Sequence, residues 1–444
     1  MSRADRLPAS AHRPSRLSRV KRPRSLVGAI GVGSLLATFV VGLVQATPVT
    51  IGFRDFKYDG GLASRATADS PQSKLWYADG SWWGGLFKAG TGAGSSDFAI
   101  YKFNQASESW TNTLTLVDRR DRTHADYLWS GTASKLYVAS TKSPCNGPSA
   151  CNDAVRIYRY TYAAGTYTPD AGFPIDVLGG PYPGSGVSVG GADTVTVTRD
   201  LLGRVFVAWT RDQTTSMAYS LSDGDPATTA DESTWSAPVV MNAGEAGQDN
   251  ISGLIRFGSS VGLYYTDRHL AGDDIGLFAI HADADDPATW TTEVVASATG
   301  AVSDQANVKA DASGNVYLVV KTGLTAPTSD QVRLFKRTAS GWGTAHGVAS
   351  VQSGNTRAQV AIQPTFDGGV GAAIVVMSNT DGAVYYKTAP LSGANALTFD
   401  VTGVGTPFIK SATDTNIFDP TTTKQVLTNA RTLLAVATDR TSFY

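Results

Sequence analysis

The chain has 444 residues, of which 42% are hydrophobic and 17% charged, so it can bury a core and is not intrinsically disordered. Only four of its 38 acidic residues are Glu, and 46 residues are Gly. Glu favours helices, whereas Asp and Gly favour turns. Because helical periodicity is also absent beyond residue 46, the sequence predicts an all-β protein with many turns.

The N-terminus differs in kind from the rest of the chain. Residues 1–24 hold eight basic residues and one acid, Leu26–Val44 is an apolar run of 19 residues, and small residues follow at Val44-Gln-Ala46. This order predicts a signal peptide over residues 1–46. A retained membrane-anchoring helix is the alternative, because 19 apolar residues can span a bilayer. In both cases residues 47–444 are expected to be exported, either secreted or held at the extracellular face of the membrane.

The net charge of residues 47–444, the part expected to be exported, limits which kinds of molecule the protein can be expected to bind. The whole chain has a formal net charge of −1, but residues 47–444 alone carry −8. A mildly acidic exported body argues against nucleic acid as a partner. Contact with a membrane is expected only through the N-terminal segment, and the oligomeric state stays open.

The chain has two cysteines, Cys145 and Cys151, in a loop-like stretch rich in Gly, Pro, Ser and Asn. In an exported protein such a pair predicts a disulfide across a short loop. Two free thiols are the alternative. Five residues separate the cysteines rather than two, which argues against a redox-catalytic pair.

Beyond residue 46 the first predicted strand is 49–58, which has no local partner. Hairpins then recur, and the clearest joins Thr194–Thr198 to Gly203–Thr210 across a short turn. Similar apolar stretches, each expected to belong to such a hairpin, follow one another at spacings of roughly 53–70 residues. They are Lys74–Ala78, Lys135–Ala139, Arg204–Ala208, Gly262–Tyr265, Asn315–Val319, Ala373–Val376 and Thr432–Val436.

Each repeat carries two further predicted strands. A third strand contains an aromatic residue, as in Phe98–Phe103, and a fourth often opens with Trp. The tryptophans are Trp110, Trp235, Trp290 and Trp342. An aromatic residue placed once per repeat is expected to pack between neighbouring blades rather than to stack on a ligand. Four strands in each repeat of this length are typical of a β-propeller.

We therefore predict that residues 47–444 form a seven-bladed β-propeller of four-stranded blades, preceded by an N-terminal apolar helix. The seventh repeat is short: residues 416–444 can supply its inner strands and residues 49–58 its outer strand. Closing the ring with strands from both termini removes exposed strand edges. Six blades are the alternative, if one of the recurring strands belongs to an irregular insertion.

Polar residues recur at or just before the first strand of each repeat, which would place them around one mouth of the central channel. The mixture of carboxylates, amides and cations suits a polyhydroxylated or anionic ligand. The candidate ligand-binding residues are Asp126, Asp193, Asp249, Asn250, Asp304, Asn307, Lys309, Lys321, Arg357 and Lys424. The alternative is that these side chains only hydrogen-bond the inner-strand backbone and water in the channel.

No pattern indicates a metal or a cofactor. The five histidines show no paired metal-binding spacing, and the aspartate clusters at 223–225 and 283–286 lack the terminal Glu of a calcium-binding loop. Neither a phosphate-binding loop nor a nucleophile elbow occurs in its required context. We therefore expect no cofactor and no metal.

Several short sequence segments after about residue 50 are similar to those of uncharacterised exported bacterial β-propeller proteins. They are Lys74–Gly84, Ala125–Trp129, Asp249–Ser252, Phe278–Asp283 and Thr422–Gln425. This resemblance implies the propeller fold and export, and no established reaction.

The Trp-containing turns also resemble, in degenerate form, the Asp-box repeat of sialidase-like propellers, because an insertion separates Ser222-Asp-Gly224 from Ser233-Thr-Trp235. Sialidases use an arginine triad, a Tyr–Glu nucleophile pair and an Asp acid/base. Among the four Glu residues only Glu245 lies where it could activate a tyrosine, and Arg54 is not in the sialidase arginine motif. Exo-sialidase activity is therefore disfavoured.

The sequence supports three functional hypotheses, and no catalytic residue can be assigned. The leading one is an exported propeller that binds a glycan or another polar ligand at the mouth of its channel. The partner it implies is an extracellular or cell-surface glycan. The second is an enzyme similar to a glycoside hydrolase or polysaccharide lyase, whose carboxylates would come from Asp126, Asp249 and Asp304. The third is an architectural or protein-binding propeller without a small-ligand site.

Overall fold

The computed structural model describes thirteen stretches of the chain, and the account below concerns these residues. They are 50–58, 66–67, 71–89, 96–120, 123–142, 155–178, 194–211, 214–221, 234–243, 251–268, 274–366, 369–428 and 432–442. Residues 1–49, with the predicted N-terminal helix, lie outside the described part. The described part includes the 3-10 turn η1 (Val351–Ser353), and none of its helices is long and apolar enough to cross a membrane.

Six antiparallel sheets follow one another along the chain. The first contains β1 (Leu75–Ala78), β2 (Ser81–Ala89), β3 (Ser96–Asn104) and β4 (Ser109–Leu116). The second contains β5 (Thr123–Ser130), β6 (Lys135–Lys142), β7 (Val155–Ala163), β8 (Thr166–Pro169) and β9 (Ile175–Leu178). The third contains β10 (Thr194–Arg199), β11 (Val205–Arg211), β12 (Thr214–Tyr219) and β13 (Val239–Ala243).

The other three sheets repeat this order. The fourth contains β14 (Ser252–Phe257), β15 (Ser260–Arg268), β16 (Asp274–Ala282) and β17 (Thr291–Ser297). The fifth contains β18 (Ala306–Ala310), β19 (Val316–Lys321), β20 (Asp330–Thr338), β21 (Gly341–Trp342) and β22 (His346–Ser350). The sixth contains β23 (Asn355–Gln363), β24 (Ala372–Asn379), β25 (Val384–Pro390) and β26 (Thr406–Ile409).

All six sheets are four strands wide. Where five strands occur, β8 and β9 both pair with β7, and β21 and β22 both pair with β20, so the fourth strand is interrupted rather than doubled. The hairpin predicted at Thr194–Thr198 and Gly203–Thr210 is β10 and β11, with Val197 opposite Val207. Alternating residues of such strands face the neighbouring sheets on both sides, which explains why the strands are apolar on both faces.

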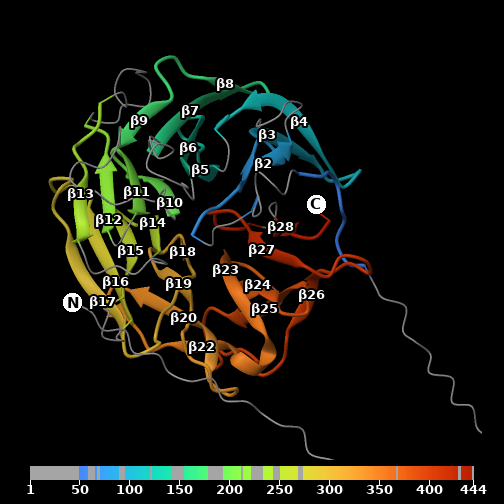
Figure 1. The fold of residues 1–444 in the computed structure, drawn as a ribbon. Coiled ribbons are helices and arrows are strands. Elements are labelled where there is room, and N and C mark those ends of the chain that lie inside the picture. The colour runs from blue at the N-terminus through green and yellow to red at the C-terminus, as the bar shows by residue number, and fades with distance from the viewer. Residues whose placement is uncertain are drawn as a thin grey trace, which may run out of the picture. The chain divides into compact units, whose positions relative to one another are not determined.

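The first strands of the sheets lie side by side around a central channel. Each contacts the next, in the order β1, β5, β10, β14, β18 and β23 (Figure 1). Because each sheet has four antiparallel strands, the chain leaves a sheet at the same face at which it entered. All inner strands therefore start at one face of the ring, which we call the entry face.

The seventh repeat differs from the other six. The described residues give it two strands, β27 (Ile417–Thr421) and β28 (Val436–Asp439), and β27 lies beside β23. A parallel bridge between Leu75 and Thr423 connects it to β1 and closes the ring. The propeller prediction is thus confirmed with six four-stranded sheets, and the place expected for a seventh four-stranded blade holds a two-stranded sheet.

The segment expected to supply the outer strand of the seventh blade makes a different contact. Ile51 pairs with Lys410, directly after the outer strand β26 of the sixth sheet. Farther along, the Tyr58 hydroxyl donates to the backbone carbonyl of Asp439 at the end of β28, at 3.0 Å. The N-terminal segment therefore joins the sixth sheet to the seventh repeat, as a brace rather than as a strand of one sheet.

The core lies between neighbouring sheets, where aromatic residues are packed. Trp290 lies against a buried phenylalanine of the preceding sheet, with ring centroids 6.0 Å apart, and Trp342 does the same at 5.2 Å. Trp110 and Trp235 pack against buried apolar clusters as well. The prediction that these tryptophans pack between blades is confirmed. Such aromatic contacts add about 0.5–1.5 kcal/mol each beyond the burial of apolar area.

Gly85 in β2 offers a direct test of the packing between the first two sheets. A Cβ atom at this position would overlap the ring of Tyr127, which is 1% exposed and stacks on Trp76 with 5.4 Å between ring centroids. We expect Gly85→Ala to lower the free energy of unfolding by about 1–3 kcal/mol, the usual effect of overpacking. Urea unfolding followed by tryptophan fluorescence measures the change.

Gly131→Ala is the matched control, because the nearest atom to its added Cβ is Nε1 of Trp129 at an acceptable 3.4 Å. A Gly85→Ala protein with the unfolding midpoint of the Gly131→Ala protein would contradict the packing described for Tyr127.

Candidate functional site at the channel and its entry face

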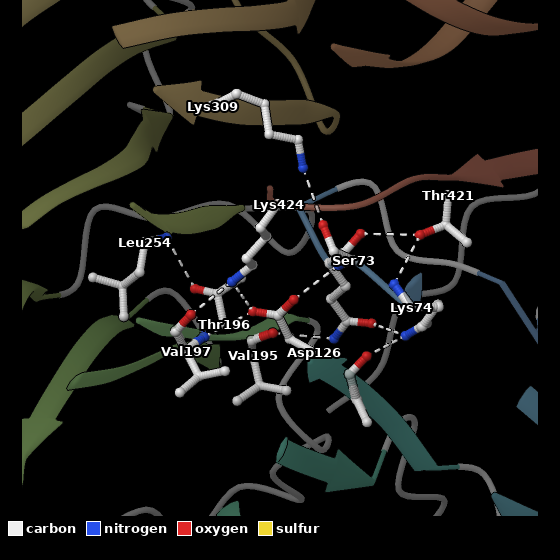
Figure 2. Close-up of polar contacts among 12 residues, drawn as sticks. Ser73, Lys74, Asp126, Val195, Thr196, Val197, Leu254, Lys309, Thr421 and Lys424 are labelled. Carbon is white, nitrogen blue, oxygen red and sulfur yellow. Dashed lines mark hydrogen bonds and ion pairs between the residues drawn. The ribbon is translucent and has the colours of Figure 1, made fainter. Parts of the chain in front are cut away.

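The middle of the channel is filled by a polar network centred on Asp126 (Figure 2). Asp126 is the fourth residue of β5, and none of its surface is exposed. Its Oδ1 accepts a hydrogen bond from the backbone N–H of Ser73, and its Oδ2 accepts one from the backbone N–H of Val197, both at 2.8 Å. Lys424 forms an ion pair with the same carboxylate and donates to the Val197 carbonyl at 2.6 Å. One buried carboxylate thus links three sheets of the ring.

Residues just before β1 complete this network, and the sequence did not indicate them. Lys74 Nζ donates to Gln72 Oε1 at 2.6 Å and to the Ala125 carbonyl, and Gln72 Nε2 donates to the Val195 carbonyl at 3.2 Å. Gln72 and Lys74 have no exposed surface. A lysine beside an apolar strand is normally a surface residue, so no local pattern in Lys74–Ala78 could have placed this ammonium group in the channel.

Lys309 reaches into the network from the opposite side of the channel, from β18 (Figure 2). It is 2% exposed, and its Nζ donates to Ser73 Oγ at 3.0 Å. No second hydrogen-bond acceptor for this ammonium occurs within the described part of the chain. Burial, and to a smaller extent the charge of Lys424, lower the pKa of Lys309, Asp126 opposes both effects, and the resulting pKa is about 7. The Asp126 carboxylate thus forms an ion pair with Lys424 and also interacts electrostatically with Lys309. Of these two lysines, Lys309 can lose its proton near neutral pH.

Other inner-strand side chains hydrogen-bond the neighbouring inner strand. Asn307 Oδ1 accepts from the backbone N–H of Val360 at 3.2 Å, and Thr196 Oγ1 accepts from that of Leu254 at 3.1 Å. Such bonds satisfy backbone groups that face the channel and have no strand beside them. Asp126, Asn307 and Lys424 make the backbone contacts of the alternative stated above. Lys309 differs, because the hydrogen bond it makes is to the side chain of Ser73.

The candidates on the entry face are more accessible. Lys321 is the last residue of β19, and Asp304 lies just before β18. Because β18 and β19 are antiparallel, the end of β19 lies beside the start of β18, so the two residues are close together. Their side chains form an ion pair at 2.9 Å and are 28% and 29% exposed. Burial by itself raises the pKa of Asp304, but the hydrogen bond and charge of Lys321 and the charge of Arg357 outweigh it and hold this pKa below its ordinary value. Arg357 therefore lies within electrostatic reach of this pair.

Arg357 belongs to a second group of charges on the same face. Its Nη1 donates to Asp419 Oδ1 at 2.8 Å, and the other oxygen of Asp419 pairs with Arg440. Arg440 directly follows β28. Because β28 runs antiparallel to β27, Arg440 lies near the start of β27. Asp304, Lys321, Arg357, Asp419 and Arg440 form what we call the entry cluster. Asp419 and Arg440 were not predicted, because no turn or motif distinguishes them in the sequence.

The backbone at two members of the entry cluster is strained. Arg357 has a φ of 51° and Asp419 a φ of 55°, in the left-handed region that disfavours side chains. The pairing register shifts at both places, between Thr356 and Gln359 and between Phe418 and Thr421. Each such residue costs about 1–3 kcal/mol, and such strain is concentrated at ligand-binding and active sites. Two adjacent inner strands thus bulge so that Arg357 and Asp419 meet on the entry face.

The remaining predicted residues are not placed. Asp193, Asp249, Asn250, Cys145 and Cys151 lie outside the described residues, so neither their part in the site nor the disulfide is tested. In the part of the chain that is described, no group of three or more His, Cys, Asp or Glu side chains is arranged to hold a metal ion.

No protein-family model and no curated protein matches this chain. Solved structures resemble it at low sequence identity. The alpha-L-arabinanase of Penicillium chrysogenum, solved with arabinobiose, is 12% identical, covers 75% of this chain and 94% of its own, and has a TM-score of 0.43. SapL1 lectin, solved with alpha methyl fucoside, is 11% identical over 71% of this chain and 88% of its own, with a TM-score of 0.40.

A third structure, the alpha-L-arabinofuranosidase PaAbf62A of Podospora anserina in complex with cellotriose, is 11% identical over 61% of this chain and 85% of its own, with a TM-score of 0.35. These three proteins are two glycosidases and a lectin, each solved with a saccharide. At such TM-scores the likenesses assign no function to this chain.

Lys309 makes the stability of the fold depend on pH in a defined direction. In the unfolded chain this lysine titrates near the ordinary value of 10.5, whereas its pKa in the fold is about 7. Between these two values the unfolded state holds a proton that the folded state has lost, so the free energy of unfolding rises with pH across this window. Below about pH 7 both states are protonated and this contribution is constant.

We therefore expect Lys309→Met to remove a rise of more than about 1 kcal/mol that the unmodified protein shows between about pH 7 and pH 9. Urea unfolding at several pH values measures it. Lys102→Met, at an exposed position, is the control and keeps the rise. Parallel pH profiles for the unmodified protein and Lys309→Met would rule out the lowered pKa.

Proposed function

We propose that this protein is an exported β-propeller that binds a glycan or another polar ligand at the entry face of its channel. The observation that carries the proposal is the entry cluster, in which five charged side chains from three adjacent repeats converge and two of them stand on strained backbone. A fold tolerates such strain where the surrounding structure over-determines it, as in ligand clamps.

The chemistry of the cluster fits a ligand with many hydroxyl groups. The carboxylate of Asp304 and the ammonium of Lys321 are paired yet remain partly exposed. A carboxylate accepts hydrogen bonds from sugar hydroxyls and a lysine donates to them, so neighbouring hydroxyls of one sugar can bridge the pair. The network below the cluster is closed to solvent at Asp126 and Lys74, so the ligand would rest on the entry face and not pass through the channel.

Two architectural points belong to the same proposal. The two-stranded sheet of the seventh repeat acts as a seventh blade, braced by the N-terminal segment through Tyr58. The resemblance to exported bacterial propellers and the basic-apolar order of residues 1–46 support export of residues 47–444.

A glycan array followed by titration calorimetry on the best ligand tests the proposal. We expect Asp304→Ala and Lys321→Ala each to weaken binding by about tenfold or more, because each removes a charge-assisted hydrogen bond of about 1.5–3 kcal/mol. Arg156→Ala is the control, since Arg156 forms an exposed ion pair with Asp176 on the outer strands of the second sheet. Unchanged affinity in both entry-cluster variants would remove the site, and an array without any bound glycan would remove the function.

A further inference from the structure

Arg357, Asp419 and Arg440 have an arrangement that a purely structural ion pair does not need. The Asp419 carboxylate lies between two guanidinium groups and gives one oxygen to each, at 2.8 Å from Arg357 Nη1. Asp419 is itself buried, with its side chain 4% exposed, whereas the side chains of Arg357 and Arg440 are 20% and 25% exposed. The carboxylate therefore forms the base of a fork whose two cationic arms reach solvent.

Most donors of this fork have no acceptor among the described residues. A guanidinium carries five N–H donors, and each arm gives one of its nitrogens to Asp419. Nε of Arg440 is buried and has no hydrogen-bond partner within the described part of the chain. The Arg440 guanidinium also lies 5.0 Å from the centre of the Phe418 ring, which holds its plane in position. The two guanidinium groups are thus held in position with N–H donors that the described part of the chain leaves without acceptors.

The net charge of the entry cluster also favours an anionic ligand group. Three cations, Lys321, Arg357 and Arg440, face two carboxylates, Asp304 and Asp419, so the entry cluster carries an excess positive charge. The exported body as a whole is acidic, with a formal charge of −8. A local positive site on an acidic body attracts an anionic group at that site without attracting polyanions to the rest of the surface.

We propose that the arginine fork of Arg357 and Arg440 binds the anionic group of an acidic sugar, a carboxylate or a sulfate, next to the hydroxyl-binding pair Asp304 and Lys321. Two oxygens of a carboxylate or of a sulfate accept paired N–H···O bonds from a planar guanidinium group, and the fork offers two such groups side by side. Asp419 positions both arms and does not touch the ligand. This inference rests on the proposed function, and it narrows the ligand class from glycans to acidic glycans.

Two matched pairs of polymers distinguish the sources of the anionic group: polygalacturonate against its methyl ester for carboxylate, and dextran sulfate against dextran for sulfate. The full exported chain is titrated with each by calorimetry. We expect one acidic polymer to bind at least about tenfold more tightly than its neutral partner, with an advantage that shrinks at high salt. We expect Arg357→Gln and Arg440→Gln each to reduce this advantage to about twofold or less.

Arg357→Lys and Arg440→Lys keep the charge but lose the paired donors, so they are expected to retain only part of the preference. Arg156→Gln, which changes an exposed ion pair of the second sheet, keeps all of it. Circular dichroism spectra and urea midpoints show whether each variant is folded, and the lysine variants carry the test if a glutamine variant is not.

Equal affinity for the acidic and the neutral member of both pairs overturns the inference. If Asp304→Ala then still weakens binding of both members, the proposed function stands without it. An acidic preference that survives in all four arginine variants places the anionic group elsewhere and also overturns the inference. If none of the four polymers binds and a glycan array shows no ligand, the proposed function fails together with it.

Discussion

The buried Asp126 carboxylate is the interaction on which the ring depends most. A propeller leaves the channel edge of each inner strand without a neighbouring strand, so backbone groups there need side-chain partners. Asp126 accepts from the backbone of Ser73 and of Val197 and pairs with Lys424, and thereby joins the first, second and third sheets to the chain after β27. Removing one partner of a buried ion pair leaves an uncompensated charge, at a cost of about 3–5 kcal/mol. The channel network therefore has a structural role: it holds the inner strands together.

The structural role of the channel network explains why a ligand site is better sought on the entry face. Side chains in the channel are buried and occupied by the backbone, whereas the entry cluster is partly exposed and stands on bulged strands. The first group stabilises the fold, and the second departs from regular strand geometry at Arg357 and Asp419. A rigid support below a strained, charged rim is the arrangement that holds donors in a fixed position before a ligand arrives.

Much of the fold could be predicted from the sequence because its signals are local. The turn after Thr194–Thr198 and the alternation of Gly203–Thr210 identify a hairpin within some twenty residues, and its recurrence identifies the propeller. Asp304 and Arg357 could be proposed as candidates because they lie at or just before the first strands of successive repeats, and Lys321 because it ends a second strand. Asp419 and Arg440 were not proposed, because neither the positive φ of Asp419 nor the return of β28 beside β27 leaves a local pattern in the sequence. The seventh repeat was only partly foreseen, since the bridge of Ile51 to Lys410 joins opposite ends of the chain.

That long-range brace also determines when the ring can be completed. The Tyr58 hydroxyl and the Asp439 carbonyl are 381 residues apart, and Thr67 bonds to Thr438 across 371 residues. Neither contact exists until residues 438 and 439 have been made, whereas each of the six sheets forms from residues close in sequence. Contacts of such high sequence separation form slowly because loop-closure entropy opposes them. A chain made from its N-terminus therefore has the residues of all six four-stranded sheets before it has residues 438 and 439, which the closing contacts require.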